Sequence, residues 1–309
     1  MRQRMAGLGT VVAIGLGSMA VAAQAPTPPQ PPAPKVVEAD KIADTLYVLK
    51  GGGGNTAMFL TAAGVVLVDT KLPGWGQPLL DKVKTLTDKP VAMVINTHAH
   101  YDHTNGQVEF PASVEVVAHA NTKRFMEEAN PVYGLQNGPQ PNIFKEHGGR
   151  GMPSRTFTDK LTLGRGAEQI DLYHFGRAHT GGDTYVVFPA LGVMHVGDTF
   201  PNRDLPIMDK NNGGSGVDFS ATLAKAAAVT GVKTIINGHN PTTMTPADVK
   251  TYSAFIGEFV AAVQAAKKAG KTVDDVVATW ATPAAYTGFN KPQPARVKAN
   301  AEVIWGETK

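Results

Sequence analysis

The stretch THAHYDH (residues 97–103) places three of the chain's nine histidines and an aspartate within seven consecutive positions. It directly follows VAMVIN (residues 91–96), an apolar run that is typical of a buried strand. The spacing His-X-His-X-Asp-His would arise by chance in roughly 4 of 10,000 sequences of this composition. A solvated polar loop is therefore a poor explanation, and the motif indicates a functional site.

The motif gathers four metal-binding side chains at the end of the predicted strand. Side chains alternate along an extended segment, so His98 and His100 lie on the same side of it. Asp102 and His103 follow where the chain turns away, and all four groups converge on one small volume. Neutral imidazole and carboxylate suit zinc and related divalent ions.

The start of the chain resembles an export segment. Two arginines precede a short apolar stretch rich in Gly and Ala, and small residues at 21–23 offer a signal-peptidase site. No basic flank of a membrane anchor follows, so we expect a signal peptide over residues 1–23 and a Pro-rich linker over 24–35. The mature protein is expected to be periplasmic or secreted.

Residues 36–309 are expected to form one large α/β domain with C-terminal helices, since 42% of the chain is hydrophobic. Removing the signal peptide takes away two arginines, which leaves 27 of the 29 basic residues against 26 acidic ones. Such a balanced surface gives no reason to expect nucleic acid or anionic lipid as a partner. No later apolar run approaches the ~20 residues of a membrane span, so we expect a soluble mature protein with no membrane partner after signal cleavage. A small-molecule substrate is the expected partner. The oligomeric state stays open.

The chain contains no cysteine. Thiolate metal sites, iron–sulfur clusters and a cysteine nucleophile are thereby excluded. The sequence also lacks a G-X-S-X-G serine elbow, so no serine nucleophile is indicated.

Short apolar runs alternate with segments of helical periodicity through both halves of the chain. In the first half, strands are expected at 45–50, 56–60, 64–70, 91–96 and 114–119 and a helix at 78–86. In the second half, strands are expected at 169–175, 183–188, 192–198 and 233–238, and helices at 218–229, 246–268, 273–280 and 295–305. Asp218 and Thr245 are the expected caps of two of these helices. Two similar halves fit a layered α/β/β/α sandwich, although periodicity alone leaves a doubly wound sheet equally open.

Three later segments place single histidines or aspartates near expected strand ends: His179 in GRAHTGGD, Asp198 in HVGDTF and His239 in INGHNP. In order and spacing, these segments together with THAHYDH and the strand GVVLVDT (64–70) resemble the metallo-β-lactamase fold superfamily. The resemblance covers about residues 40–241 and implies the fold of that family, an α/β four-layered αβ/βα sandwich. THAHYDH is highly specific, whereas the later segments are weak singly and strong in this order.

The resemblance implies a binuclear metal site with two Zn²⁺ per chain, iron being the alternative metal. The implied ligands are His98, His100 and His179 for the first ion, Asp102, His103 and His239 for the second, and Asp198 as the bridge between them. All seven positions carry a competent ligand, which argues against a non-catalytic relative. Asp69 would orient ligands or loops without touching metal, or would serve only as a cap at its strand end.

Other conspicuous features receive structural interpretations. The remaining histidines are expected to be packed or hydrogen-bonded: His119, His147, His174 and His195. For His195, a position beside the metal ligands is the alternative. Gly51–Gly54 lacks the lysine and the helix of a phosphate-binding loop, so we expect a mobile hairpin tip over the site. Residues 211–216 are expected to border the site. Basic residues near the C-terminus are expected on helix surfaces: Lys267, Lys268, Lys271 and Arg296.

The resemblance also implies the chemistry of the site. Two zinc ions held by these residues would make hydroxide available near neutral pH for attack on an acyl carbon or another electrophilic centre. Asp102 would orient the nucleophile and relay a proton, which makes it the candidate catalytic residue. The implied function is an exported metal-dependent hydrolase of ester, lactone, thioester or amide bonds, β-lactams included.

The residue at position 198 discriminates between branches of the superfamily. Zinc β-lactamases usually carry Cys or Ser at the matching position, whereas glyoxalase II-like thioester hydrolases, lactonases and many esterases carry Asp. Export favours β-lactams and disfavours cytosolic glutathione thioesters. The substrate therefore stays open.

Two alternatives to hydrolysis also remain. The persulfide dioxygenase branch keeps the His-X-His-X-Asp-His run but uses a single iron, so a mononuclear iron oxidoreductase is the first. The diiron flavoprotein branch typically carries Glu at the second histidine, and His100 argues against it. A non-catalytic metal-binding protein is the second alternative. About two zinc ions per chain would favour hydrolysis, and one iron would favour dioxygenation.

Overall fold

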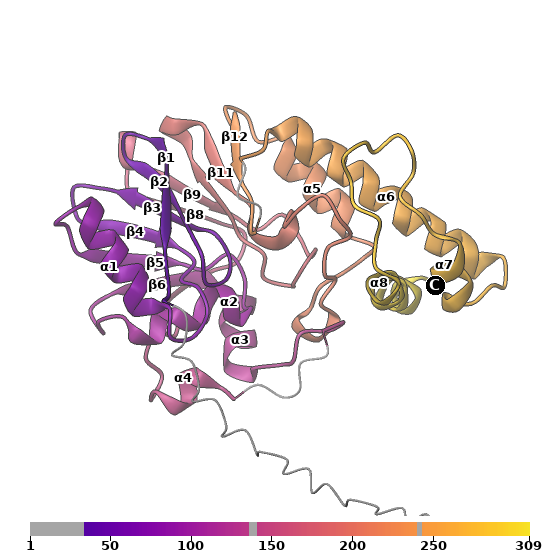
Figure 1. Ribbon diagram of the computed structural model, residues 1–309, viewed down its shortest axis with the longest axis horizontal. Coiled ribbons are helices and arrows are strands. Elements are labelled where there is room, and N and C mark those ends of the chain that lie inside the picture. Colours follow the sequence, from indigo (N-terminus) through magenta and orange to yellow (C-terminus); the bar gives the residue numbers. More distant parts are fainter. Residues whose placement is uncertain (1–33, 136–140, 240–242) are drawn as a thin grey trace, which may run out of the picture. The chain divides into compact units, whose positions relative to one another are not determined.

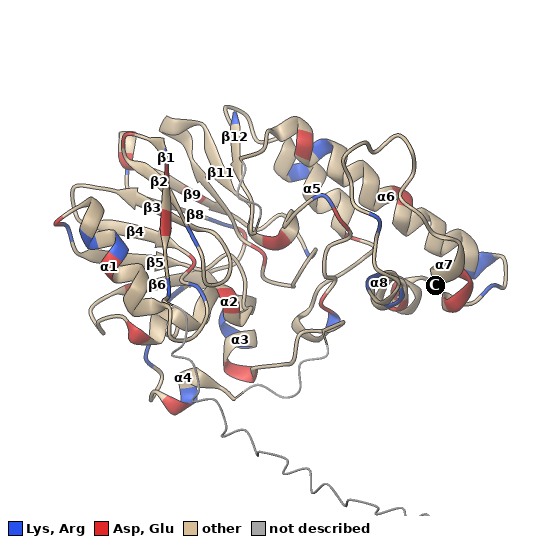
Figure 2. Ribbon diagram, viewed as in Figure 1, with Lys and Arg blue, Asp and Glu red and all other residues tan. Residues whose placement is uncertain are grey.

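The computed structural model describes residues 34–135, 141–239 and 243–309 (Figure 1). The chain divides into two units, of which the second, Lys35–Lys309, contains every element below. The expected signal peptide and all but the last two residues of the expected linker lie outside the described residues. Basic and acidic residues are interspersed over the described elements (Figure 2), in keeping with the balanced composition.

The first half of the domain forms a seven-stranded sheet whose strands follow one another in chain order. Its strands are β1 (Glu38–Ala43), β2 (Leu46–Lys50), β3 (Thr56–Leu60), β4 (Val65–Val68), β5 (Val91–Ile95), β6 (Glu115–His119) and β7 (Arg155–Phe157). β1 to β4 pair as antiparallel neighbours, and β4 to β7 pair in parallel. Parallel neighbours end at the same edge of a sheet, so the chain leaves β4 and β5 on one side.

A separate five-stranded sheet with the order β12-β11-β10-β9-β8 follows in the second half. Its strands are β8 (Lys160–Leu163), β9 (Ile170–Tyr173), β10 (Tyr185–Phe188), β11 (Val193–His195) and β12 (Thr234–Ile236). β11 and β12 are parallel, so their carboxyl ends also share an edge. Because the strands form two separate sheets, the alternative of a single doubly wound sheet is excluded.

The inner faces of the two sheets pack on each other. One core cluster joins Phe59 of β3 and Val68 of β4 to Val186 and Phe188 of β10. The Phe59 and Phe188 rings lie 4.9 Å apart. These side chains are almost fully buried, and burial of apolar area is what holds the two sheets face to face.

Helices cover the outer face of each sheet. On the first sheet, Leu79 and Val83 of α1 (Gly76–Leu86) pack against the outward apolar side chains. On the second sheet, α5 (Phe219–Ala227) and α6 (Pro246–Lys268) do the same, with Phe255 and Phe259 fully buried. The helix–sheet–sheet–helix order confirms the expected four-layered αβ/βα sandwich. The shorter helices α2 (Tyr101–Thr104), α3 (Ala120–Glu128) and α4 (Ile143–Glu146) lie along the connections of the first sheet.

Three helices close the chain: α6, α7 (Val273–Thr279) and α8 (Pro294–Glu307). Thr245 caps α6 through a reciprocal capping box, as expected for a threonine before a proline. Asp218 lies at the cap of α5 but accepts no cap hydrogen bond, because its carboxylate accepts from the Arg177 guanidinium instead. α8 packs into the α5–α6 core through Val297, which ties the C-terminal helices to the domain. No helix in the three described ranges is both long and apolar enough to cross a bilayer.

Candidate metal centre

The seven predicted ligands reach the site from four different connections. His98 and His100 follow β5, and His100 forms the cap of α2, which carries the next two ligands of the motif. His179 lies between β9 and β10. Asp198 and His239 follow the parallel strands β11 and β12. The site therefore lies where strand ends of both sheets meet.

Four of the predicted residues form one buried group: His98, His100, His179 and Asp198. One ligand atom from each lies within 4.8 Å of every other. His179 Nε2 is 3.0 Å from His100 Nδ1. His98 Nε2 is buried and has no hydrogen-bond partner among the described residues. An orphaned buried nitrogen is costly unless something else occupies the space that it faces.

The remaining three residues form a second group: Asp102, His103 and His239. The Nε2 atoms of His103 and His239 lie 3.2 Å apart. Asp198 reaches this group as well, since its Oδ1 is 3.3 Å from His103 Nε2 and its Oδ2 is 3.0 Å from His239 Nε2. Its Oδ2 also lies 3.9 Å from His179 Nε2, so Asp198 stands between the two groups.

The outer ring nitrogens of the four buried histidines lie beside acceptors, which favours one tautomer for each. Thr97 Oγ1 gives its proton to Asp69, so the hydroxyl accepts from His98 Nδ1 at 3.0 Å. His179 Nδ1 donates to the Ile207 carbonyl at 2.8 Å. Their inner Nε2 atoms therefore carry lone pairs that face the centre of the cluster.

The carboxylates of Asp209 and Asp69 accept from the outer ring nitrogens of the other two buried histidines, His100 and His103. His100 Nε2 lies 2.8 Å from Asp209 Oδ2, which leaves Nδ1 facing inward. His103 Nδ1 lies 2.8 Å from Asp69 Oδ2, which leaves Nε2 facing inward. Four lone pairs at close range repel one another unless a cation lies between them, so this donor set fits metal ions.

The electrostatics of the cluster agree with a cation site. Burial lowers the pKa of His98 well below its usual value, and the nearby imidazoles lower it further. Burial alone would raise the pKa of Asp198, but His103 and His239 hold it well below its usual range. The pKa of His239 is raised even though burial opposes this, mainly because Asp198 favours its charged form. The carboxylates thus attract positive charge to the place where the lone pairs converge.

Asp69 forms a third close group with His98 and His103, but hydrogen bonds occupy its carboxylate, so we interpret it as a residue that orients the cluster. Its carboxylate accepts from the Thr97 amide at 2.8 Å, from the Thr97 hydroxyl at 2.7 Å and from His103. Its backbone adopts φ +66°, a left-handed conformation that costs a non-glycine residue free energy. The three hydrogen bonds hold Asp69 there, as expected of a residue that orients ligands.

We expect Asp69→Asn to weaken metal binding by about 10- to 100-fold. The amide nitrogen cannot accept, so either Thr97 or His103 loses its partner and the imidazole is no longer held in one tautomer. Metal competition with a chromogenic chelator measures the effect. Asp81→Asn, on the exposed face of α1, is the matched control. Unchanged affinity in Asp69→Asn would remove this orienting role.

The glycine turn between β2 and β3 is packed on the site, which corrects the expectation of a mobile tip. Gly54 N donates to the Asp102 carbonyl at 3.0 Å, and Asn55 N donates to the Gly238 carbonyl at 2.6 Å. A Cβ at Gly54 would lie 2.1 Å from the His103 ring, so glycine is required by this close approach. The turn therefore joins the two loops that carry the second ligand group.

The buried lysine Lys71, which no sequence pattern indicated, holds this turn. Lys71 Nζ donates to the carbonyls of Leu49 and Gly54, both at 2.6 Å. Burial lowers its pKa to about 7, against the opposing effect of Asp69 and Asp102. Few lysines are fully buried without a strong structural reason, and here the reason is the turn.

We expect Lys71→Met to lower the free energy of unfolding by about 2–4 kcal/mol, because two buried carbonyls lose their donor. Urea denaturation followed by circular dichroism measures it. Lys84→Met removes an exposed lysine from α1 and should leave stability within about 0.5 kcal/mol of the parent. If both variants unfolded at the same urea concentration, Lys71 would not hold the turn.

A cavity beside the ligands opens toward α8 and measures about 350 Å³. His179, Asp198 and His239 form one wall, and Arg296 of α8 contributes to another. The sequence interpretation of Arg296 as a helix-surface residue is therefore wrong, since it lines the same cavity as the ligands. The start of α8 lies beside the ligand-bearing loops, a long-range proximity that helical periodicity does not reveal.

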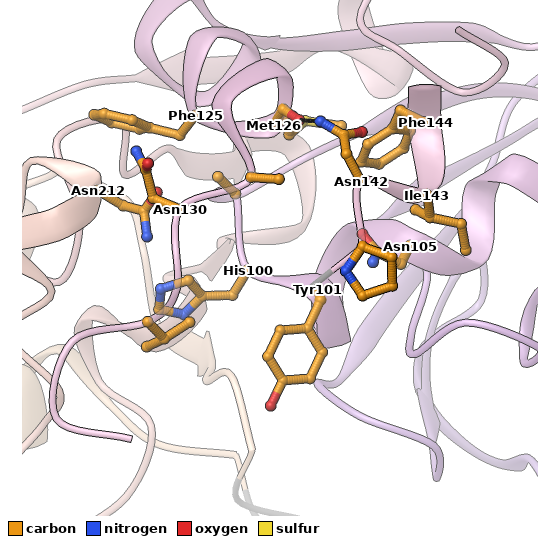
Figure 3. Close-up of a pocket in the computed structure, with 14 residues that line it drawn as sticks. His100, Tyr101, Asn105, Phe125, Met126, Asn130, Asn142, Ile143, Phe144 and Asn212 are labelled. Carbon is orange, nitrogen blue, oxygen red and sulfur yellow. Dashed lines mark hydrogen bonds between the residues drawn. The ribbon is translucent and has the colours of Figure 1, made fainter. Parts of the chain in front are cut away.

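A second, smaller pocket lies behind His100 (Figure 3). Its volume of about 50 Å³ has room for only a few water molecules. Apolar side chains from α3 and α4 line it, Phe125 and Phe144 among them, together with the asparagines Asn105, Asn130, Asn142 and Asn212. It is too small to hold a substrate by itself.

The other histidines lie outside the ligand groups. His195 bonds the Asn55 carbonyl and the Gly197 amide, so it is an ordinary hydrogen-bonded histidine. His119 and His174 stack at 4.2 Å, and His147 bonds the Ile143 carbonyl at the surface. Residues 211–216 do border the site, since Ser215 N donates to the Ala178 carbonyl beside His179.

Comparison with known proteins agrees with this geometry. Residues 49–259 match the family model of the metallo-beta-lactamase superfamily. A metallo-beta-lactamase from Pontibacter korlensis superposes with a TM-score of 0.59 at 18% identity, over 72% of this chain and 99% of that one. The sec-alkylsulfatase Pisa1 from Pseudomonas sp. superposes with a TM-score of 0.69 at 13% identity, over 88% of this chain and 50% of that one. The metallo-beta-lactamase FIM-1 from Pseudomonas aeruginosa, in its mono-zinc form, superposes with a TM-score of 0.57 at 15% identity, over 74% of this chain and 97% of that one.

The match spans more than half of the sequence, and the chain belongs to the metallo-beta-lactamase superfamily. It is accordingly a metal-dependent hydrolase, and its buried His/Asp cluster fits the metal site of that family.

Proposed function

We propose that this protein is an exported, binuclear zinc hydrolase of ester, lactone, thioester or amide bonds. One observation carries the proposal: two ligand groups with inward-facing nitrogens share the carboxylate of Asp198. If the site held one ion, one of the two ligand groups would have no cation. The Asp198 carboxylate, which lies between the groups, suits a pair of ions.

Each group is assigned one zinc ion. The first would be held by three histidines, His98, His100 and His179, and the second by Asp102, His103 and His239, with Asp198 shared. Bound zinc would supply hydroxide near neutral pH and polarise the bond under attack. Four of the histidines, His98, His100, His103 and His179, aim their inner nitrogens at the positions of the ions, because Asp69, Asp209 and two neutral acceptors hold the outer ones. Against the effect of burial, the nearby carboxylates raise the pKa values of His103 and His239, so these two rings would lose protons when zinc binds.

Asp102 is assigned the proton transfer. Its side chain is 23% exposed, compared with 9% for Asp198, and its Oδ2 lies 3.3 Å from His239 Nε2. A partly exposed carboxylate beside the ligands can accept a proton from the nucleophile and pass it to solvent or to the leaving group. Asp198, which is buried and held ionised by two imidazoles, is less suited to that exchange.

The proposed substrates are small molecules that meet an exported enzyme. Asp in place of Cys or Ser at position 198 favours an esterase, lactonase or thioesterase over a dedicated β-lactamase. The proposed signal peptide over residues 1–23 makes β-lactams accessible, so a cephalosporin belongs in any substrate panel.

The test combines metal analysis with a substrate panel on the same preparation, purified from cells without added metal. About two zinc ions per chain, with hydrolysis of a lactone, a thioester, an aryl ester or a chromogenic cephalosporin, is the expected result. EDTA should abolish the activity and lower the melting temperature, and zinc should restore both. A single iron with persulfide oxidation, or no turnover at all, would overturn the proposal.

A further inference from the structure

The cavity beside the proposed zinc ligands contains a guanidinium with unused hydrogen-bonding capacity. Arg296 is partly buried, and its one hydrogen bond within the described residues is a long one, 3.4 Å from a terminal nitrogen to the Leu205 carbonyl. A guanidinium carries five N–H donors and stays charged in proteins. Most of its donors are therefore available to something in the cavity.

Arg296 also forms no ion pair among the described residues. Burial lowers its pKa, and the charges of Tyr252, Asp204 and Asp198 oppose this only in part. Partly buried Arg203 pairs with Asp248 at 2.9 Å, and exposed Arg177 pairs with Asp218 at 2.8 Å. The Asp204 carboxylate lines the same cavity as Arg296 but accepts from the Leu205 amide and is beyond ion-pair distance of the guanidinium. A partly buried cation with no carboxylate at ion-pair distance costs free energy, which a bound anion would offset.

The position of Arg296 in its helix adds to this cost. It lies in the first turn of α8, which has no acidic residue and no side-chain cap. The positive end of the helix dipole repels a cation and attracts an anion. The start of α8 therefore adds to the attraction of the Arg296 guanidinium for an anion and does not offset its positive charge.

The cavity itself connects this cation to the reaction centre. Arg296 and Gln293 line it from α8, and His179, Asp198 and His239 line it from the sheets. Arg296 lies beyond residues 49–259, the part that matches the family model, so it is a feature of this chain's C-terminal helices.

We propose that Arg296 binds an anionic group of the substrate, so that the natural substrates are esters, lactones or amides that carry a carboxylate or another oxyanion away from the bond that is cleaved. This inference rests on the proposed hydrolytic function. Arg296 positions the substrate by its charged end while the scissile bond lies at the ligands. A planar guanidinium suits carboxylate and sulfonate alike.

The test compares mono-p-nitrophenyl glutarate with its methyl ester, which lacks the charge. The rate without enzyme is subtracted for each, because the free carboxylate of the monoester attacks its own aryl ester to give glutaric anhydride and p-nitrophenolate. The zinc-loaded parent is expected to prefer the anionic ester by about tenfold or more in kcat/KM. Arg296→Gln should lower kcat/KM for the anionic ester about 10- to 100-fold and that for the neutral ester less than threefold, and Arg296→Lys should recover part of the loss. Lys298→Gln, an exposed residue of the same helix that pairs with Asp274, is the control and should change neither. Equal losses for both esters in Arg296→Gln would overturn the inference.

A binding measurement keeps the inference testable if neither ester is hydrolysed. Calorimetric titration of the zinc-loaded protein with glutarate should give a Kd at least about tenfold higher for Arg296→Gln than for the parent and for Lys298→Gln. Arg296-dependent binding without hydrolysis would count against these esters as substrates and leave the anion site standing. Equal glutarate affinity in the parent and Arg296→Gln would refute the anion site, whatever the activity.

Discussion

His100→Ala is expected to lower kcat/KM by at least about 10³-fold and to release one metal ion per chain. His100 supplies one of the inward nitrogens of the first ligand group, 3.0 Å from His179 Nε2, and alanine offers no substitute donor. Loss of residues that merely orient ligands costs about 10- to 100-fold, so loss of a ligand should cost more. Zinc content by mass spectrometry and turnover of the best substrate of the panel measure the two effects.

The matched control is His147→Ala, which removes an exposed histidine whose ring bonds only a nearby carbonyl. It should retain both ions and full activity. The melting temperature of each variant in EDTA separates a lost ligand from a damaged fold. Full activity and metal content in His100→Ala would refute the assignment of the first ion.

Gly238→Ala is expected to lower kcat/KM by about 10²-fold or more, although glycine contributes no ligand. A Cβ at this position would lie 1.8 Å from Asp198 Oδ1, so the shared carboxylate would have to move. Displacing a catalytic group by about 1 Å can cost that much. Both proposed ions depend on Asp198, so weaker binding of both should accompany the loss.

Gly306→Ala provides the control for Gly238→Ala. Gly306 lies in α8, and nothing lies within 4 Å of the position of its Cβ. Alanine there should leave activity unchanged and stabilise the helix by up to about 1 kcal/mol. If Gly238→Ala also left activity unchanged, Asp198 would not depend on the close contact with Gly238.

The predicted elements agree with the structure where apolar periodicity and burial coincide. The boundaries expected for β3 and α6 match those observed, because both segments bury a regular set of apolar side chains. β1 was missed because its sequence EADKIA lies at the edge of the sheet and is mostly exposed. β11 was predicted to run through Asp198 but ends at His195, since Gly197 adopts φ +52° and begins a turn. That turn aims Asp198 at the other ligands.

The site was predicted in part from the residues and in part from the resemblance. Side-chain alternation alone grouped the motif at residues 98–103. The addition of His179, Asp198 and His239 required the known order of the superfamily, because long-range proximity has no periodic signal in a single sequence. The structure brings all seven side chains together.

Apart from Asp69, the residues that support the ligands or line the cavity could not be found from the sequence. Asp209 bonds His100 across 109 positions, in a loop without a motif. Lys71 follows the end of a strand, where lysines are ordinarily solvated, and only its burial reveals its contacts. Arg296 resembles any helix-surface arginine until the fold places it in the cavity.

Anomalous diffraction at the zinc edge from crystals of the zinc-loaded protein tests the central claim most directly. Two peaks are predicted, one among the imidazoles of His98, His100 and His179 and the other among Asp102, His103 and His239, with Asp198 between them. Zinc at only one of these positions, or bound elsewhere on the chain, would contradict the binuclear centre.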